Sequence, residues 1–94
     1  MQTMLKIAMS PSELAKFRHD MFVRGWMGKG DMEKFLQIGR RQRVEVWDEL
    51  EKEAEKEGKR PLKDKMMTSR VMRYAGLSEK RIVGDYERLG GANK

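Results

Sequence analysis

One stretch decides the fold of this chain: residues 61–89, PLKDKMMTSRVMRYAGLSEKRIVGDYERL. At its centre Gly76 predicts the end of a helix, because glycine readily takes the left-handed conformation in which helices stop. Leu77 can then fold back on Met72, as in a Schellman motif. The hydroxyl of Ser78 can accept from a free backbone N–H and so start a second helix. Two helices joined this abruptly are expected to cross at a steep angle.

The sequence on either side of this turn predicts a helix over 61–75 and a second helix over 79–89. In the first helix the apolar arc is formed by Met67, Val71, Tyr74 and Ala75, and a neighbouring basic arc by Lys63, Arg70 and Arg73. In the second helix the expected buried stripe is Ile82, Tyr86 and Leu89. Gly84 lies inside that helix at a cost of roughly 1 kcal/mol relative to alanine, which indicates close approach by a phosphate backbone or by another helix.

The composition indicates one folded domain. The chain has 94 residues, of which 38% are hydrophobic and 38% charged, so long helical faces must lie in solvent. It has no cysteine, which excludes disulfides, thiolate metal sites and a cysteine nucleophile, and is compatible with the cytoplasm. We expect no signal peptide and no membrane span, because the apolar N-terminal run is interrupted by Lys6 and halted by Pro11.

The whole chain, residues 1–94, is predicted to form one all-α domain of four helices, in which the remaining residues pack against the 61–89 unit. Residues 1–9 form an apolar arm or a short strand, and residues 10–58 form helical support for the basic unit at 59–91. A capping box starts the first helix at Ser10, and Gly25 ends it. After a flexible connection, one long helix is expected from Asp31 or Met32 to Glu57, with a bend at Gly39 as the alternative. Its apolar face includes Met32, Phe35, Leu36, Val46, Trp47, Leu50 and Ala54.

The charge is concentrated at the C-terminal end. Residues 1–30 carry +3, residues 31–58 carry −3 and residues 59–94 carry +6, which sum to the net charge of +6. A cationic region of this kind attracts phosphate backbones or acidic protein surfaces.

The residues around the turn resemble the helix-turn-helix family of DNA-binding domains. The resemblance is carried by Gly76-Leu77-Ser78-Glu79-Lys80-Arg81-Ile82: a turn glycine, an apolar residue, a hydroxyl cap, three polar residues and a β-branched anchor. Two positions depart from the family pattern. Met72 stands where a small side chain is usual, and Asp85 stands where an apolar one is usual.

This resemblance implies a set of DNA-binding residues. In the second helix Ser78, Glu79, Lys80, Val83, Gly84 and Glu87 would face the major groove, with Arg81 and Arg88 near phosphates. In the first helix Lys63, Arg70 and Arg73 would cross the DNA backbone. Such proteins usually bind as symmetric dimers, and the apolar face of the long central helix offers a surface for a homodimer. The implied function is that of a transcriptional or phage-type regulator.

The alternative is a protein-interaction module, such as an adaptor, an inhibitor or a small subunit. It would bind its partner through Trp26, Trp47 and Leu50, with the basic end docking on an acidic surface. An enzyme is not expected, because the single histidine, His19, lies on a polar helical face and the carboxylates lie on a solvated helix. No metal-ligand spacing or cofactor motif is present, so no metal and no cofactor are expected.

Overall fold

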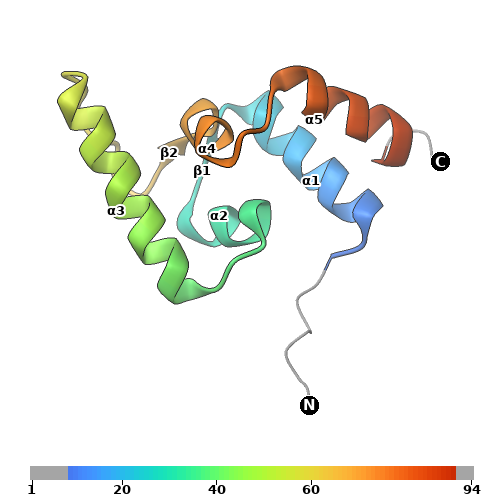
Figure 1. Ribbon diagram of the computed structural model, residues 1–94, viewed down its shortest axis with the longest axis horizontal. Helices are drawn as coiled ribbons and strands as arrows, with labels where there is room; N and C mark the ends of the chain where they lie inside the picture. The colour runs from blue at the N-terminus through green and yellow to red at the C-terminus, as the bar shows by residue number, and fades with distance from the viewer. Residues whose placement is uncertain (1–8, 91–94) are drawn as a thin grey trace, which may run out of the picture.

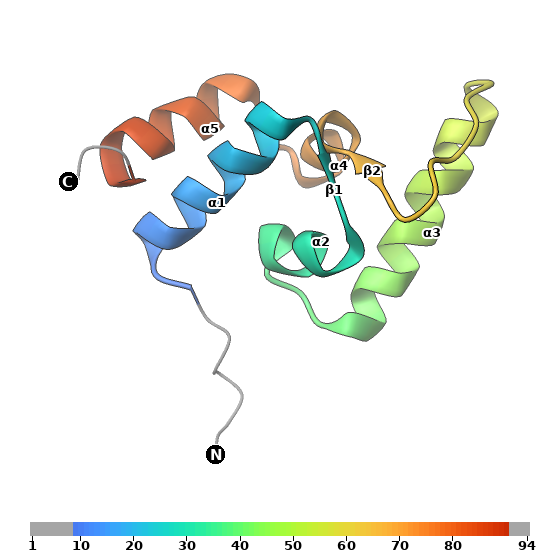
Figure 2. The same cartoon turned by 180° about the vertical axis from the view of Figure 1, so that it is seen from behind.

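The chain folds into a mainly helical domain with a two-stranded antiparallel sheet, as a computed structural model shows for residues 9–90. The elements in chain order are α1 (Pro11–Arg24), β1 (Trp26–Met27), α2 (Lys29–Leu36), α3 (Arg40–Lys56), β2 (Met66–Met67), α4 (Thr68–Ala75), α5 (Glu79–Asp85) and a π-helical turn (Tyr86–Gly90). Figure 1 and Figure 2 show α1 beside α5 at one end of the molecule and α3 at the other, with the sheet and α4 between them. The predicted arm over 1–9 lies outside the described residues except for Met9.

The first helix follows the sequence prediction. Ser10 Oγ accepts from the backbone N of Glu13 at 3.1 Å, while the Glu13 carboxylate accepts from Ser10 N at 2.9 Å, which completes the capping box. Gly25 ends the helix with φ of 89°, and its N–H donates to Met21 O at 2.9 Å. Both ends of α1 are therefore set by local sequence, as predicted.

The predicted long central helix is wrong: the chain breaks it into α2 and α3. Gln37 takes the left-handed conformation, with φ of 56°, and Gly39 becomes the N-cap of α3. A straight helix at 1.5 Å per residue would spread the apolar face along about 39 Å. The break folds the two halves together, so that Phe35 from α2 and Trp47 from α3 enter the same core. Together with α1, α4 and α5 this gives five α-helices within residues 9–90 instead of four.

The helix expected over 61–75 begins only at Thr68. Residues 61–65 form a loop in which Asp64 has a positive φ of 56°, and β2 follows it, pairing Met67 with Trp26 and Met66 with Met27. The supposedly flexible connection after α1 therefore contains a strand and the first turn of α2. Thr68 fixes the arrangement, because its buried hydroxyl donates to Met21 O at 2.9 Å. Such tertiary contacts override helical propensity in the preceding residues.

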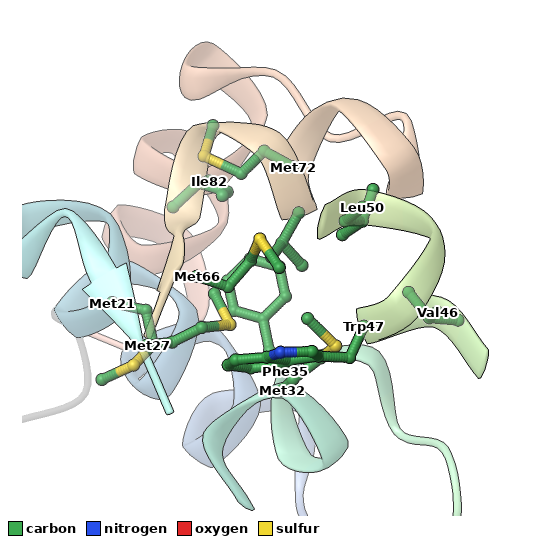
Figure 3. Packing of buried hydrophobic residues seen from close by; sticks show 11 residues of the cluster. Met21, Met27, Met32, Phe35, Val46, Trp47, Leu50, Met66, Met72 and Ile82 are labelled. Atoms are coloured by element: carbon green, nitrogen blue, oxygen red, sulfur yellow. The ribbon is translucent and has the colours of Figure 1, made fainter. Parts of the chain in front are cut away.

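One core joins the elements, and methionine contributes much of it. Figure 3 shows Phe35 and Trp47 surrounded by Met27, Met32 and Met66. The complete buried cluster is Met21, Met27, Met32, Phe35, Val46, Trp47, Leu50, Met66, Val71, Met72 and Ile82. Methionine suits such a core because its unbranched side chain fills irregular gaps between short elements.

The apolar face predicted for homodimer formation lies inside this core. Trp47 is 5% exposed and Leu50 is 1% exposed, so neither presents a surface to a second copy of the chain. The prediction that this face of the central helix forms a homodimer contact is therefore corrected. This face packs against the remaining residues of the core within a single chain.

Candidate nucleic-acid interface

The turn between α4 and α5 has the local geometry expected from its residues. Gly76 adopts the left-handed conformation, with φ of 71°, and Leu77 N donates to Met72 O at 2.9 Å. Ser78 Oγ accepts from Arg81 N at 3.0 Å and so caps α5. The free backbone groups at the end of α4 and at the start of α5 are therefore satisfied within the turn itself.

One side of α5 and of the π-helical turn is anchored against the rest of the domain. Ile82 is buried in the core, and Leu89 lines a shallow groove against α1. The ring of Tyr86 stacks on His19 of α1, with ring centroids 4.0 Å apart and planes 8° apart. His19, expected on a polar face, is thus half-buried in the contact between α1 and the last turn. Because these contacts fix one side of α5 against the domain, its opposite side faces the solvent.

That opposite side, here called the outward face of α5, is polar. It consists of Ser78, Glu79, Lys80, Arg81, Gly84, Glu87 and Arg88, of which all but the half-buried Gly84 are exposed. A Cβ atom placed on Gly84 would meet no other atom within 4 Å. No part of the described chain therefore requires glycine at this position, and the close approach by another helix considered from the sequence does not occur here.

Asp85 organises the arginines of this region. It accepts from Arg88 Nη2 at 2.6 Å and from Arg81 Nε at 3.3 Å. The hydrogen bond from Arg88 lowers the pKa of the Asp85 carboxyl, and the charge of Arg81 lowers it further. The residue that departs from the helix-turn-helix pattern thus pairs with two of the predicted phosphate-binding arginines. Lys80, by contrast, takes part in none of the ion pairs found within residues 9–90.

Acid should weaken this arrangement. Since the pKa of Asp85 is lower in the folded chain, its stabilising contribution is present above the unfolded value of about 3.9 and is lost as the pH falls through the folded value. Thermal melts are expected to show a falling melting temperature below about pH 4. Asp85→Asn should lower the melting temperature at pH 7 and flatten this dependence. If the melting temperature of Asp85→Asn falls as steeply below about pH 4 as that of the wild type, this role for Asp85 is contradicted.

The residues predicted in the preceding helix are dispersed. Lys63 lies in the loop before β2, and Arg73 is exposed on α4, 3.9 Å from Glu57. Arg70 is not free to bind a phosphate, because its side chain is buried and its donors are occupied by Glu57 and Glu53, which corrects the prediction for this residue. Its side chain is 7% exposed and donates to both carboxylate oxygens of Glu57, at 2.8 and 3.1 Å. This ion pair raises the pKa of Arg70, and its hydrogen bond lowers the pKa of Glu57.

The predicted partner-binding residues do not share a surface either. Trp47 and Leu50 lie in the core, whereas Trp26 is half-buried. The guanidinium carbon of Arg24 lies 4.0 Å from the centroid of the Trp26 ring, and the ammonium of Lys65 lies 4.6 Å from it. Lys65 was missed by the sequence reasoning, which expected a helix where the structure has a loop and a strand.

The charge of the C-terminal end is distributed unevenly. Residues 78–90 hold three basic and three acidic side chains, so the segment that carries α5 is neutral. Residues 59–73 hold six basic and one acidic side chain. The cationic surplus thus lies mainly before the turn, in the loop and in α4.

Within residues 9–90, no helix is long and apolar enough to cross a membrane. The same part of the chain contains no group of three or more histidine, aspartate or glutamate side chains placed to hold a metal ion. Comparison of the chain with protein-family models, with curated proteins and with solved structures found no match.

Proposed function

We propose that this protein binds duplex DNA through the outward face of α5, with α4 and α5 acting as a helix-turn-helix. The observation that carries the proposal is the division of α5 into two sides. One side is anchored by Ile82 and Tyr86, while the other leaves Lys80 and Arg88 exposed. A helix held in this way can enter the major groove, where lysine and arginine read guanine. The corresponding biological role is that of a cytoplasmic transcriptional or phage-type regulator.

Gly84 adds a second line of support. Glycine inside a helix lowers stability relative to alanine, and nothing in the described chain fills the space above it. A surface without a side chain lets a DNA backbone or base edge approach the helix closely. The stability lost at this position is explained if DNA occupies that space.

Charge reversal at Lys80 tests the proposal. Lys80→Glu places a carboxylate on the outward face of α5 and should weaken binding to random duplex DNA about tenfold at low salt. The matched control is Lys52→Glu on α3, which changes the net charge equally at the far end of the molecule (Figure 1) and should change the affinity less than about twofold. Fluorescence anisotropy with a labelled duplex measures both. Equal losses in the two variants would show attraction by net charge alone and would contradict the proposal.

The salt dependence gives the size of the interface. The outward face holds three cations, Lys80, Arg81 and Arg88, of which the two arginines pair with Asp85 in the free protein. A plot of log affinity against log salt concentration should therefore have a slope no steeper than about −3. A steeper slope would require additional cations from the 59–65 loop.

Gly84→Ala separates folding from binding. We expect it to raise the free energy of unfolding by up to about 1 kcal/mol, since alanine favours the helix and meets no neighbour. The added methyl group should at the same time reduce DNA affinity severalfold, because it occupies the surface that meets the groove. Gly30→Ala in α2, also unobstructed, should leave DNA affinity unchanged. Denaturant unfolding and anisotropy measure the two properties. An unchanged affinity in Gly84→Ala would exclude close approach of DNA at this position.

A further inference from the structure

A groove on the other side of the molecule is not used by the proposed DNA-binding face. It has a volume of about 250 Å³ and lies between the C-terminal half of α3, the 59–65 loop and β2. Figure 2 shows the loop running back along α3 toward β2. Its apolar lining comes from Ala54, Pro61, Leu62, Met66 and Met67.

Two large apolar side chains of this groove are exposed to solvent. Leu62 and Met67 are each 46% exposed, although the core of the domain is otherwise well covered. Of the five large hydrophobic side chains exposed within residues 9–90, only these two line the groove. Exposed apolar side chains that gather in one concave place are typical of binding surfaces.

The groove is held open by backbone contacts. At the end of α3, Gly58 has φ of 80° and Lys59 N donates to Ala54 O at 2.9 Å, which turns the chain back sharply. The pairing of Met66 and Met67 with β1 holds the other end of the loop. A groove prepared in this way loses little conformational entropy when a ligand enters.

The lining of the groove carries four cations, of which one, Arg70, forms ion pairs within the described chain. Lys59, Arg60 and Lys65 are exposed, and none of them takes part in an ion pair within the described residues. Arg70 also lines the groove, but Glu57 and Glu53 occupy its donors. The one carboxylate in the lining, Glu51, accepts from Trp47 Nε1 at 3.0 Å. The groove therefore combines an apolar floor with a positively charged rim.

We propose that this groove binds a short acidic segment of a partner protein, with one or two apolar side chains on the floor and flanking aspartate or glutamate residues on Lys59 and Arg60. The volume lies below the roughly 300–1,000 Å³ typical of small-molecule sites and suits one or two side chains. Nucleic acid phosphates would satisfy the rim but would leave Leu62 and Met67 in water. The apolar floor therefore favours a peptide, and Met67 can adapt its shape to the side chain that enters. This site lies apart from α5 and adds a protein partner to the proposed DNA binding.

The experiment uses a displayed library of random twelve-residue peptides, selected on the full chain. Enriched peptides should share one or two large apolar residues flanked by aspartate or glutamate. Synthetic copies should lose at least tenfold in affinity against Leu62→Asp and against the double variant Lys59→Glu/Arg60→Glu. The matched control is Val44→Asp, which places the same charge on an exposed apolar residue outside the groove and should bind as the wild type does. Thermal melts of all variants confirm that the fold is kept.

Four outcomes would overturn the proposal. The first is a selection without enrichment, and the second is enriched peptides without acidic residues. The third is a loss in Val44→Asp equal to that in Leu62→Asp. Fluorescence anisotropy with random duplex DNA tests whether the groove binds nucleic acid instead of a peptide. If Lys59→Glu/Arg60→Glu weakens DNA binding as strongly as Lys80→Glu does, while Leu62→Asp leaves peptide binding intact, the rim serves nucleic acid and the peptide site is rejected.

Discussion

Phe35→Ala is expected to destabilise the domain by about 3–5 kcal/mol, the range for removing a fully buried aromatic side chain. The Phe35 ring is 0% exposed, and Figure 3 shows it in the middle of the methionine-rich cluster. The substitution leaves a cavity between short elements that cannot close on it. Small domains have only about 5–15 kcal/mol of total stability, so much of the margin is lost. The melting temperature should fall by about 12 °C or more.

Phe35 also marks where α1 meets α2. Arg18 of α1 donates from Nε and Nη2 to the Phe35 carbonyl oxygen, at 2.9 and 2.8 Å, and caps the C-terminal end of α2. The control is Phe22→Ala, the same change at a half-buried residue on the edge of the core, which should cost clearly less. Urea unfolding followed by circular dichroism measures both. Equal losses would mean that the core is not centred on Phe35.

Arg70→Ala is expected to cost about 2–3 kcal/mol of stability. The guanidinium connects α4 to the C-terminal end of α3 through two hydrogen bonds to Glu57, and its side chain is almost fully covered. The loss should stay below the 3–5 kcal/mol typical of broken buried ion pairs, because the carboxylate left behind is 39% exposed and reaches water. Arg70→Lys should fall between the wild type and alanine, since lysine keeps the charge without the planar fork.

The matched control is Arg73→Ala on the same helix. Arg73 is 64% exposed and lies 3.9 Å from the same Glu57, so its loss should cost less than about 1 kcal/mol. Chemical unfolding gives the stabilities, and anisotropy on the folded variants should show that Arg70→Ala keeps its DNA affinity. Similar stabilities of the two alanine variants would refute the structural role of Arg70. Loss of affinity in a folded Arg70→Ala protein would return Arg70 to the DNA-binding residues.

The sequence predicted the structure correctly wherever the local conformation depends only on neighbouring residues. The capping box at Ser10, the stop at Gly25 and the turn from Gly76 to Ser78 act within a few positions, and all have the predicted geometry. The mainly helical class also follows from periodicity. These features need no knowledge of distant parts of the chain.

The errors arise where distant segments meet. The apolar period continues across Gly39 and favoured one helix over the alternative of a bend there, and no local signal pointed to the left-handed Gln37 that turns the chain back. The pairing of Met66 and Met67 with β1 joins residues about forty positions apart and replaces a helix that the local sequence favours. The burial of Arg70 depends on Glu57 at the end of another helix. The groove is lined by the loop and strand that residues 59–67 form in the structure. It could not be predicted from the sequence, because residues 61–67 were expected to be helical.

DNA contact by the outward face of α5 can be observed directly by nuclear magnetic resonance of the ¹⁵N-labelled full chain titrated with a short random-sequence duplex. We expect amide shift changes concentrated over residues 76–88, largest around Lys80 and Gly84, with α3 little affected. Shift changes centred on α3 or on the 59–65 loop, or none at all at low salt, would contradict this expectation.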